Sequence, residues 1–116
     1  MDLRPQLTVR FFREEKCFGP GVAMLMEQIE KTHSLRGAAK EMDMAYSKAW
    51  KILKNAEEQL GFALTQTASG GKVGGTVLTE KGKDLLTRYR AYVREVNRFA
   101  GEAFLREFGD YLPKDT

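Results

Sequence analysis

The fold of this 116-residue chain is decided by the stretch SLRGAAKEMDMAYSKAWKILKNAEEQL, residues 34–60. In its first part, Leu35, Ala39 and Met42 recur at steps of four and three residues, which is typical of a helix that buries one side. Its second part repeats apolar residues at the same period, at Tyr46, Ala49, Trp50, Leu53, Ala56 and Leu60. Asp43-Met44-Ala45 separates the two parts. The stretch therefore predicts two helices joined by a tight turn, the first of them capped by Ser34.

The other side of the second predicted helix gathers cations and short polar side chains. At roughly 100° per residue, the positions opposite the apolar side are Ser47, Lys48, Lys51, Lys54 and Asn55. Such a face can lie against phosphates and base edges in the major groove of DNA. Because a solvated helix of any protein shows the same pattern, the neighbouring segments have to decide between a DNA-binding helix-turn-helix and a helix pair without that role.

A glycine-rich stretch follows, and it favours DNA binding. Gly61 is suited to end the second helix. Residues 62–78, FALTQTASGGKVGGTVL, place two short segments around a tip with four glycines in six residues, which predicts a β-hairpin. A hairpin directly after a helix-turn-helix is the wing of a winged-helix domain. At its tip, Gly70, Gly71 and Lys72 can approach a phosphate closely; a merely flexible loop is the alternative.

The tip does not have the sequence of a nucleotide-binding P-loop. That motif requires a glycine where this chain has Gln66, and a Ser or Thr where it has Val73. Nucleotide binding is therefore not expected of this loop.

The N-terminal part predicts a small β structure and one more helix. Leu7, Val9 and Phe11 alternate with Thr8, Arg10 and Phe12, as in a strand, and residues 16–18 can return as a second one. The sequence Gly-Pro-Gly at 19–21 then opens a helix. Helical spacing continues through Val22, Leu25, Met26 and Ile29.

A long last helix is predicted from its cap at Thr79 to about Leu112. Its apolar residues step by four and three, a heptad-like seam of Leu85, Tyr89, Tyr92, Val96, Phe99 and Ala103. A second row, Leu86, Val93 and Ala100, lies beside it. One row can pack on the domain and leave the other for a second copy of the chain, and we assign the seam to this dimerisation. A dimer fits a two-fold DNA site. The alternative is that both rows pack inward.

These elements predict a mainly α fold with a small β part (α+β), and 42% hydrophobic residues in 13.2 kDa suffice for one core. The winged helix-turn-helix domain is expected at residues 1–78, with the helix-turn-helix at 34–60 and the wing at 62–78. The C-terminal helix, 79–112, is expected to pack on this domain and to dimerise, and residues 113–116 form a tail.

Positive charge is concentrated on the segments that would meet DNA. The whole chain carries a net charge of only +3. Residues 34–55 hold five basic against two acidic side chains, and residues 62–83 hold three against one. Residues 1–33 and 84–116 are balanced, with five and six side chains of each sign. The excess lies where a nucleic-acid surface needs it.

The remaining composition argues against several other classes. Cys17 is the only cysteine, so no internal disulfide can form, and a buried thiol in a reducing compartment is expected. With His33 as the only histidine, neither a metal site nor the paired groups of an enzyme are expected. No apolar run approaches the roughly 20 residues that cross a bilayer, and the N-terminus lacks a signal-peptide core. A cytoplasmic protein without metal or cofactor is predicted.

Two motifs resemble a known family. Tyr46-Ser47-Lys48-Ala49-Trp50 and the glycine-rich stretch at 69–79 are similar to the N-terminal DNA-binding domain of the molybdate-responsive ModE-type regulators. That domain is itself similar to the LysR-type winged helix. The resemblance covers residues 18–100 and implies a homodimeric transcription factor on a palindromic operator, with residues 45–60 as the recognition helix.

The chain departs from this family in two ways. Ala45 stands where family members tend to have Ser, and Ala is the poorer cap by about 1 kcal/mol. The C-terminal oxyanion-binding domain of the full-length regulators has no counterpart in these 116 residues. Molybdate is therefore not expected to bind this chain, and a link to molybdate transport or metabolism rests on the resemblance alone.

Roles in double-stranded DNA binding are assigned by side-chain chemistry. Bases are expected to be read by three side chains, Lys48, Lys51 and Asn55, with Ser47 at the helix start, because Asn pairs well with adenine and Lys with guanine. Phosphates are expected to be held by Arg36, Lys40, Lys54 and Lys72. The alternative is a winged-helix module that binds proteins through its aromatic last helix, without specific DNA binding.

Overall fold

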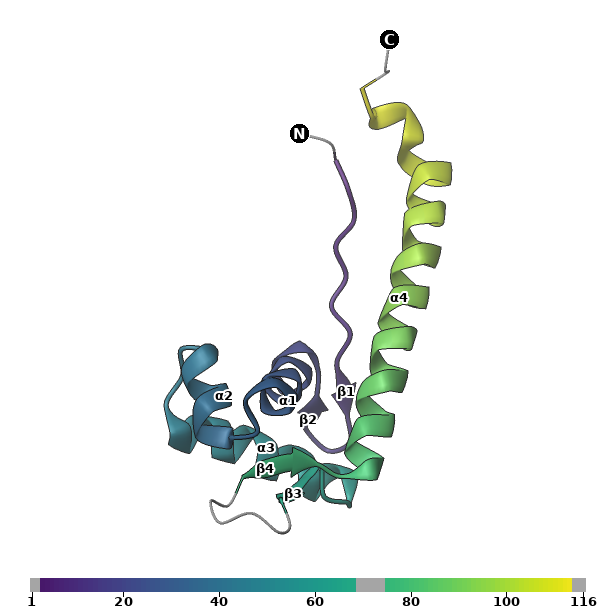
Figure 1. Ribbon diagram of the computed structural model, residues 1–116. Helices are drawn as coiled ribbons and strands as arrows, with labels where there is room; N and C mark the ends of the chain where they lie inside the picture. The colour runs from purple at the N-terminus through teal and green to yellow at the C-terminus, as the bar shows by residue number, and fades with distance from the viewer. Residues whose placement is uncertain (1–2, 69–74, 114–116) are drawn as a thin grey trace.

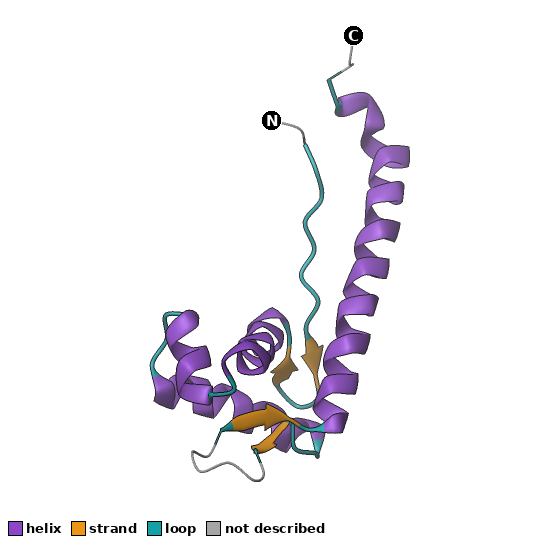
Figure 2. Cartoon of the chain, in the orientation of Figure 1, coloured by secondary structure: helices purple, strands orange, loops and turns teal. Residues whose placement is uncertain are grey.

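The computed structural model describes residues 3–68 and 75–113 of the chain. Its elements in order are β1 (Phe11–Phe12), β2 (Lys16–Phe18), α1 (Pro20–Thr32), α2 (Leu35–Glu41), α3 (Tyr46–Leu60), β3 (Thr65–Thr67), β4 (Thr76–Leu78), α4 (Glu80–Phe108) and the 3₁₀ turn η1 (Gly109–Tyr111). Helices α1 to α3 and the two hairpins lie at one end, and α4 extends away from them over a molecule 61 Å long (Figure 1). Two small antiparallel sheets beside four α-helices confirm the predicted mainly α winged-helix fold (Figure 2).

The helix ends are set by the local signals that the sequence predicts. The Ser34 hydroxyl accepts a hydrogen bond from the Gly37 N–H at 2.9 Å, and the Thr79 hydroxyl does the same for Gly82 at 2.9 Å. Helix α3 ends at Gly61, whose φ of 86° is the left-handed conformation that favours glycine. At its other end stands Ala45, whose methyl group cannot accept a hydrogen bond.

Small residues allow the three helices of the domain to approach closely. Ala38 and Ala39 on α2 and Ala49 and Ala56 on α3 are all 0–1% exposed. Asp43 takes a left-handed φ of 55° in the turn between α2 and α3. This turn and the packing of the buried alanines set the direction of α3 relative to α2.

The core joins the helices to the N-terminal hairpin and to the start of α4. Its fully buried large side chains are Phe18, Leu25, Met26, Ile29, Leu53, Leu64 and Leu86. Phe18 packs edge-on against Tyr89 of α4, with ring centroids 5.0 Å apart. The Tyr89 hydroxyl donates a hydrogen bond of 2.7 Å to the Val9 carbonyl. Burial raises the pKa of Tyr89, an effect that the nearby charge of Arg10 partly offsets.

The first strand is shorter than the alternation predicts. Only Phe11 and Phe12 pair with β2, and a bulge shifts the register between them. Within the described residues, the segment from Leu3 to Arg10 is extended without a strand partner and runs beside α4 (Figures 1 and 2). The partner strand is only three residues long, so it cannot pair with a longer β1. Cys17 is buried in this hairpin, as expected.

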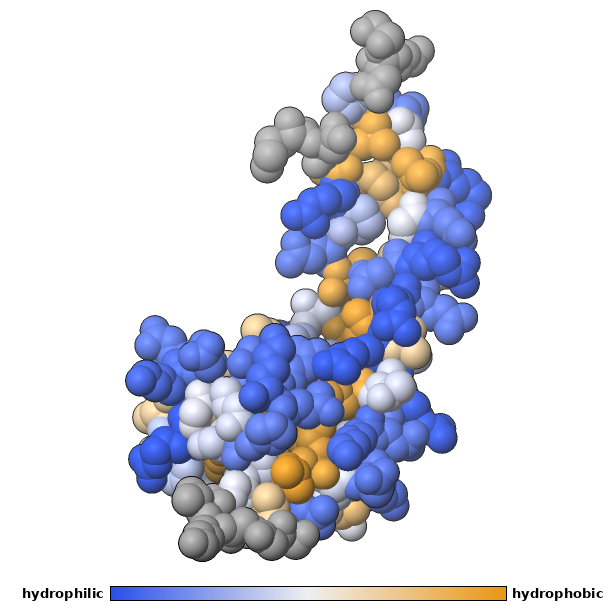
Figure 3. Space-filling model, in the orientation of Figure 1, coloured by the Kyte–Doolittle hydropathy of each residue, from blue (hydrophilic) through white to orange (hydrophobic). Residues whose placement is uncertain are grey.

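The burial of apolar side chains on α4 changes along the length of the helix and does not separate the two apolar rows. Leu86 and Tyr89, one from each row, are buried, and Leu85 and Val93 pack against the core. Tyr89, which the seam assigns to dimerisation, is thus part of its own core. Five large apolar side chains further along are exposed: Tyr92, Phe99, Leu105, Phe108 and, in η1, Tyr111. The first turns therefore belong to the domain, and the distal turns carry open apolar surface (Figure 3).

The tight contact between α4 and the chain before β3 gives a first prediction. A Cβ added at Gly82 would collide with the Leu64 backbone carbonyl, whereas one added at Gly101 of the same helix meets nothing within 4 Å. Gly82→Ala is expected to lower the free energy of unfolding by about 1–3 kcal/mol. Gly101→Ala should raise it by up to about 1 kcal/mol, as alanine does in an open helix. Urea unfolding measures both, and equal effects of the two variants would contradict this packing.

Candidate nucleic-acid interface

Helix α3 turns one polar face to solvent. Ala49, Leu53 and Ala56 are buried against the domain. On the opposite side lies a ridge of four exposed side chains, here termed the outer face of α3: Ser47, Lys51, Lys54 and Glu58. Lys48 is also exposed and lies beside this ridge. Three of the lysines predicted to meet DNA are therefore open to a partner.

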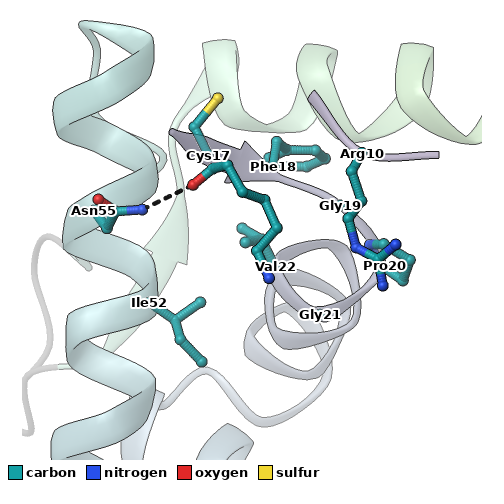
Figure 4. A pocket seen from close by; sticks show the side chains of 10 residues that line it. Arg10, Cys17, Phe18, Gly19, Pro20, Gly21, Val22, Ile52 and Asn55 are labelled. Atoms are coloured by element: carbon teal, nitrogen blue, oxygen red, sulfur yellow. Dashed lines mark hydrogen bonds between the residues drawn. The ribbon is translucent and has the colours of Figure 1, made fainter. Parts of the chain in front are cut away.

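Asn55 does not join these lysines. Its side chain is half-buried, and the amide nitrogen donates a hydrogen bond of 3.2 Å to the Lys16 carbonyl of β2 (Figure 4). It borders a hollow of about 350 Å³ together with Arg10, Cys17 and Ile52. A two-bond contact with adenine would require this amide to leave β2, so the predicted base-reading role of Asn55 competes with a structural one.

The two cations predicted on α2 lie beside the start of α3. Arg36 and Lys40 are exposed, and both border a hollow of about 430 Å³ with Tyr46. The Arg36 guanidinium lies over the Tyr46 ring, 4.4 Å from its centroid, a cation–π contact that restricts the arginine. The start of α3 therefore has two cations next to it, in the place where phosphate contacts are expected.

The ammonium group of Lys54 has a partner within α3, which the sequence pattern does not indicate. Its ammonium pairs with the Glu57 carboxylate at 3.1 Å and lies 5.8 Å from the centroid of the Trp50 ring. The side chain nevertheless keeps 48% of its surface exposed. Glu57 offsets part of its charge, so we expect Lys54 to contribute less to phosphate binding than the unpaired pattern suggests.

Glu57 connects α3 to the wing, a role that the sequence reasoning missed. Its carboxylate accepts hydrogen bonds from the backbone N–H groups of Leu64, at 2.7 Å, and Thr65, at 3.3 Å. Only 12% of the side chain is exposed. A glutamate on a helix carries no signal of such a bond in the sequence, because the partners are main-chain groups seven and eight residues further on.

The other strand of the wing is held by backbone contacts. In the hairpin, Thr65 pairs with Leu78 and Thr67 with Thr76. The Thr76 N–H then donates a hydrogen bond of 2.9 Å to the His33 carbonyl, at the end of α1. The first strand of the wing is thus attached to α3 at its start, and the second to the end of α1 at its loop end. The predicted tip residues Gly70, Gly71 and Lys72 lie outside the described residues.

The described residues offer a surface for anions rather than a metal centre. Across residues 3–68 and 75–113, no three His, Cys, Asp or Glu side chains gather as a metal ion would require. None of the helices in these same ranges has the length and apolarity to cross a membrane. What the geometry presents is a helix with exposed lysines, two further cations beside its start and a hairpin fixed at its end.

A helix-turn-helix followed by a hairpin fixed to its second helix defines a winged helix-turn-helix of the DNA-binding class. Residues 24–83 match the family described as bacterial regulatory helix-turn-helix protein, lysR family. The chain belongs to this family, and its biochemical class is that of a DNA-binding transcriptional regulator.

Individual relatives confirm the resemblance to the ModE-type domain. The chain is 37% identical to the molybdenum transport protein ModE of Herbaspirillum seropedicae over 71 residues, which are 60% of this chain and 26% of that protein. It is 35% identical to the molybdenum-pterin-binding protein MopB of Rhodobacter capsulatus over 68 residues, 58% of this chain and 25% of that one. The chain thus matches about a quarter of the length of these curated relatives.

The Glu57 bridge gives a second prediction. Glu57→Ala leaves two partly buried backbone N–H groups without their charged acceptor, and we expect it to cost about 2–3 kcal/mol of folding free energy. Glu58→Ala is the matched control, because the neighbouring carboxylate is exposed, and it should change stability by less than about 0.5 kcal/mol. Chemical denaturation measures both variants. Similar, small losses in the two would show that Glu57 does not hold the wing.

Proposed function

We propose that this chain binds a specific, two-fold symmetric DNA site as a homodimer. The observation that carries the proposal is the outer face of α3, which presents lysines to solvent while the opposite side is packed in the core. An α-helix with such a face fits the major groove of B-DNA, which is about 12 Å wide. Family membership supports DNA as the partner.

In this proposal the cations divide into two kinds. Lys48 and Lys51 reach base edges, where lysine pairs best with guanine, and Ser47 lies at the entry of the helix. Arg36 and Lys40, beside the helix start, hold phosphates and set the register, with Lys54 as a weaker third contact. Gly70, Gly71 and Lys72 at the wing tip are assigned to phosphates as well, on their chemistry alone.

The second copy of the chain is proposed to pack on the distal part of α4. Tyr92, Phe99, Leu105 and Phe108 are between 47% and 60% exposed there. A run of exposed aromatic and aliphatic side chains on one helix is typical of an interface. From the predicted seam, Tyr92, Val96, Phe99 and Ala103 remain available, since Leu85 and Tyr89 pack on their own domain.

A link to molybdenum physiology is the least direct part of the proposal. It is supported by the names of two relatives, a molybdenum transport protein and a molybdenum-pterin-binding protein. We infer that the genes under control concern molybdate transport or use. No molybdate site is proposed in these 116 residues.

Two lysines with different proposed roles should respond differently to mutation. Lys51→Ala removes a base contact and is expected to weaken binding to the preferred site about tenfold, with a smaller loss on random DNA. Lys40→Ala removes a phosphate contact, so it should weaken all sequences alike and reduce the slope of log K against log salt by about 1. Fluorescence anisotropy with labelled duplexes, chosen by selection from a random pool, measures both.

Arg88→Ala is the matched control for these variants. Arg88 is an exposed cation on α4 that pairs with Asp84, away from α3. Its loss should leave affinity and salt slope unchanged. If Lys51→Ala and Lys40→Ala also bind like the parent chain, the outer face of α3 is not the DNA surface; if selection returns no enriched sequence at all, specific binding itself is refuted.

The dimer can be tested apart from DNA. Phe99→Asp places a charge in the proposed apolar interface and is expected to raise the dimer dissociation constant at least tenfold. Thr87→Asp introduces the same charge at an exposed position of the same helix, next to the core-packed turns, and should leave the constant unchanged. Sedimentation equilibrium measures the constant. A parent chain that is monomeric at high micromolar concentration would overturn this part of the proposal.

A further inference from the structure

Trp50 occupies an unexpected place on α3. The apolar period of the sequence puts it on the buried side, yet 45% of its surface is exposed. It is the only tryptophan of the chain. Tyr46, one helical turn earlier, is 40% exposed, so the two aromatic residues form an open row along α3.

The surroundings of the indole are partly polar and partly open. Trp50 borders a hollow of about 590 Å³ with Lys54, Glu57 and Phe62, at the side of α3 that faces the root of the wing. The Lys54 ammonium lies 5.8 Å from the centroid of the ring. Of these neighbours, Glu57 is already engaged with the backbone of the wing. The indole thus keeps a large apolar area in water, which a partner could bury with gain of free energy.

The position of Trp50 relative to the outer face decides which partner that is. At about 100° per residue, Trp50 lies only about 40° around the helix from Lys54 and about 60° from Ser47. A helix with its side chains is about 10–12 Å across and fills a groove of about 12 Å. A major groove that receives the outer face of α3 therefore lies next to the indole.

The edges of the base pairs in that groove offer a single apolar group. Guanine, adenine and cytosine present donors and acceptors there, and only thymine presents a methyl group, at its C5 position. An indole has a broad apolar surface and a single N–H donor, so it is poorly suited to pair with the donors and acceptors of the other bases. A thymine methyl is the chemical group that its exposed surface fits.

We propose that Trp50 reads a thymine in each half of the DNA site by contact with the C5 methyl group. The inference rests on the proposed function, since it requires α3 to enter the major groove. It adds an apolar element to a surface that otherwise selects by hydrogen bonds and charge. Tyr46, which is held under Arg36, lies one turn further back and supports the start of the helix instead.

The test removes the methyl group without altering the protein. In the selected duplex, each thymine is replaced in turn by deoxyuridine, which lacks only this methyl, and binding is measured by anisotropy. At one symmetric position per half-site the parent chain should lose about fourfold in affinity per methyl, the worth of one buried methylene-sized group. Trp50→Ala should bind the thymine and uracil duplexes equally, because the group that senses the methyl is gone.

Lys51→Ala serves as the matched control. It should weaken binding to both duplexes but keep the fourfold difference between them. The inference is overturned if deoxyuridine has no effect at any position, or if the effect persists undiminished in Trp50→Ala. A uniform loss in Trp50→Ala without any methyl dependence would instead indicate contact with the phosphate backbone, and would equally overturn it.

These outcomes keep the two proposals apart. If the parent chain enriches a DNA site and Lys51→Ala weakens it, but deoxyuridine is tolerated everywhere, only the role of Trp50 fails. If no DNA sequence is enriched, the proposed function fails first. The deoxyuridine series needs only the parent chain, so it can overturn the inference even if Trp50→Ala folds poorly.

Discussion

The burial of small side chains on α2 and α3 is the constraint on which the rest of the structure depends. Ala38, Ala39, Ala49 and Ala56 are almost completely buried, and in a close-packed core a larger side chain at these positions would push neighbouring elements apart. With this side of α3 fixed in the core, the helical period places the opposite side in solvent. The lysines of α3 are therefore exposed because the alanines of the same helix are buried.

Two polar side chains of α3 attach neighbouring segments to this helix. Glu57 ties the beginning of the wing to α3, and Asn55 ties β2 to the same helix. Both use side-chain groups of α3 to satisfy backbone groups of a neighbouring segment, so the hairpins on either side take their positions from the helix that carries the lysines. An interface whose parts share one rigid helix loses little conformational entropy when it binds.

The local elements could be predicted from the sequence because their signals are local. Ser34, Thr79 and Gly61 act within one turn of their own helix ends, and the glycine-rich hairpin and the long last helix follow from short-range patterns. The features that could not be predicted depend on distant partners. Asn55 is bound by a carbonyl 39 residues away, and Glu57 by the backbone of the wing.

The same reason explains why two apolar patterns predict more burial than the structure shows. Periodicity assigns Trp50 to the buried side, but the domain covers only a narrow stripe of α3, and the indole at the edge of that stripe stays half open. On α4 the period is regular over the whole helix, while the domain reaches only its first turns. The period of apolar residues identifies the apolar face of a helix. It carries no information about how far along that face the packing partner extends.

The modest charge of this surface has a consequence for how it could select DNA. Lys54 is paired with Glu57, and Glu58 lies on the outer face itself, so one copy brings few unopposed cations to the phosphates. Each phosphate contact contributes about one unit to the slope of log K against log salt, and few contacts mean weak non-specific binding.

Joining two copies through α4 would make the second half-site contact intramolecular, which raises affinity without added charge. In such a dimer, discrimination between DNA sequences depends on short-range contacts, of lysine with guanine and of the indole with a thymine methyl, because the general attraction for DNA is low. The exposed apolar turns of α4 and the low net charge then act together. Specificity comes from two linked domains that are each weakly attracted to DNA, and not from one strongly cationic domain.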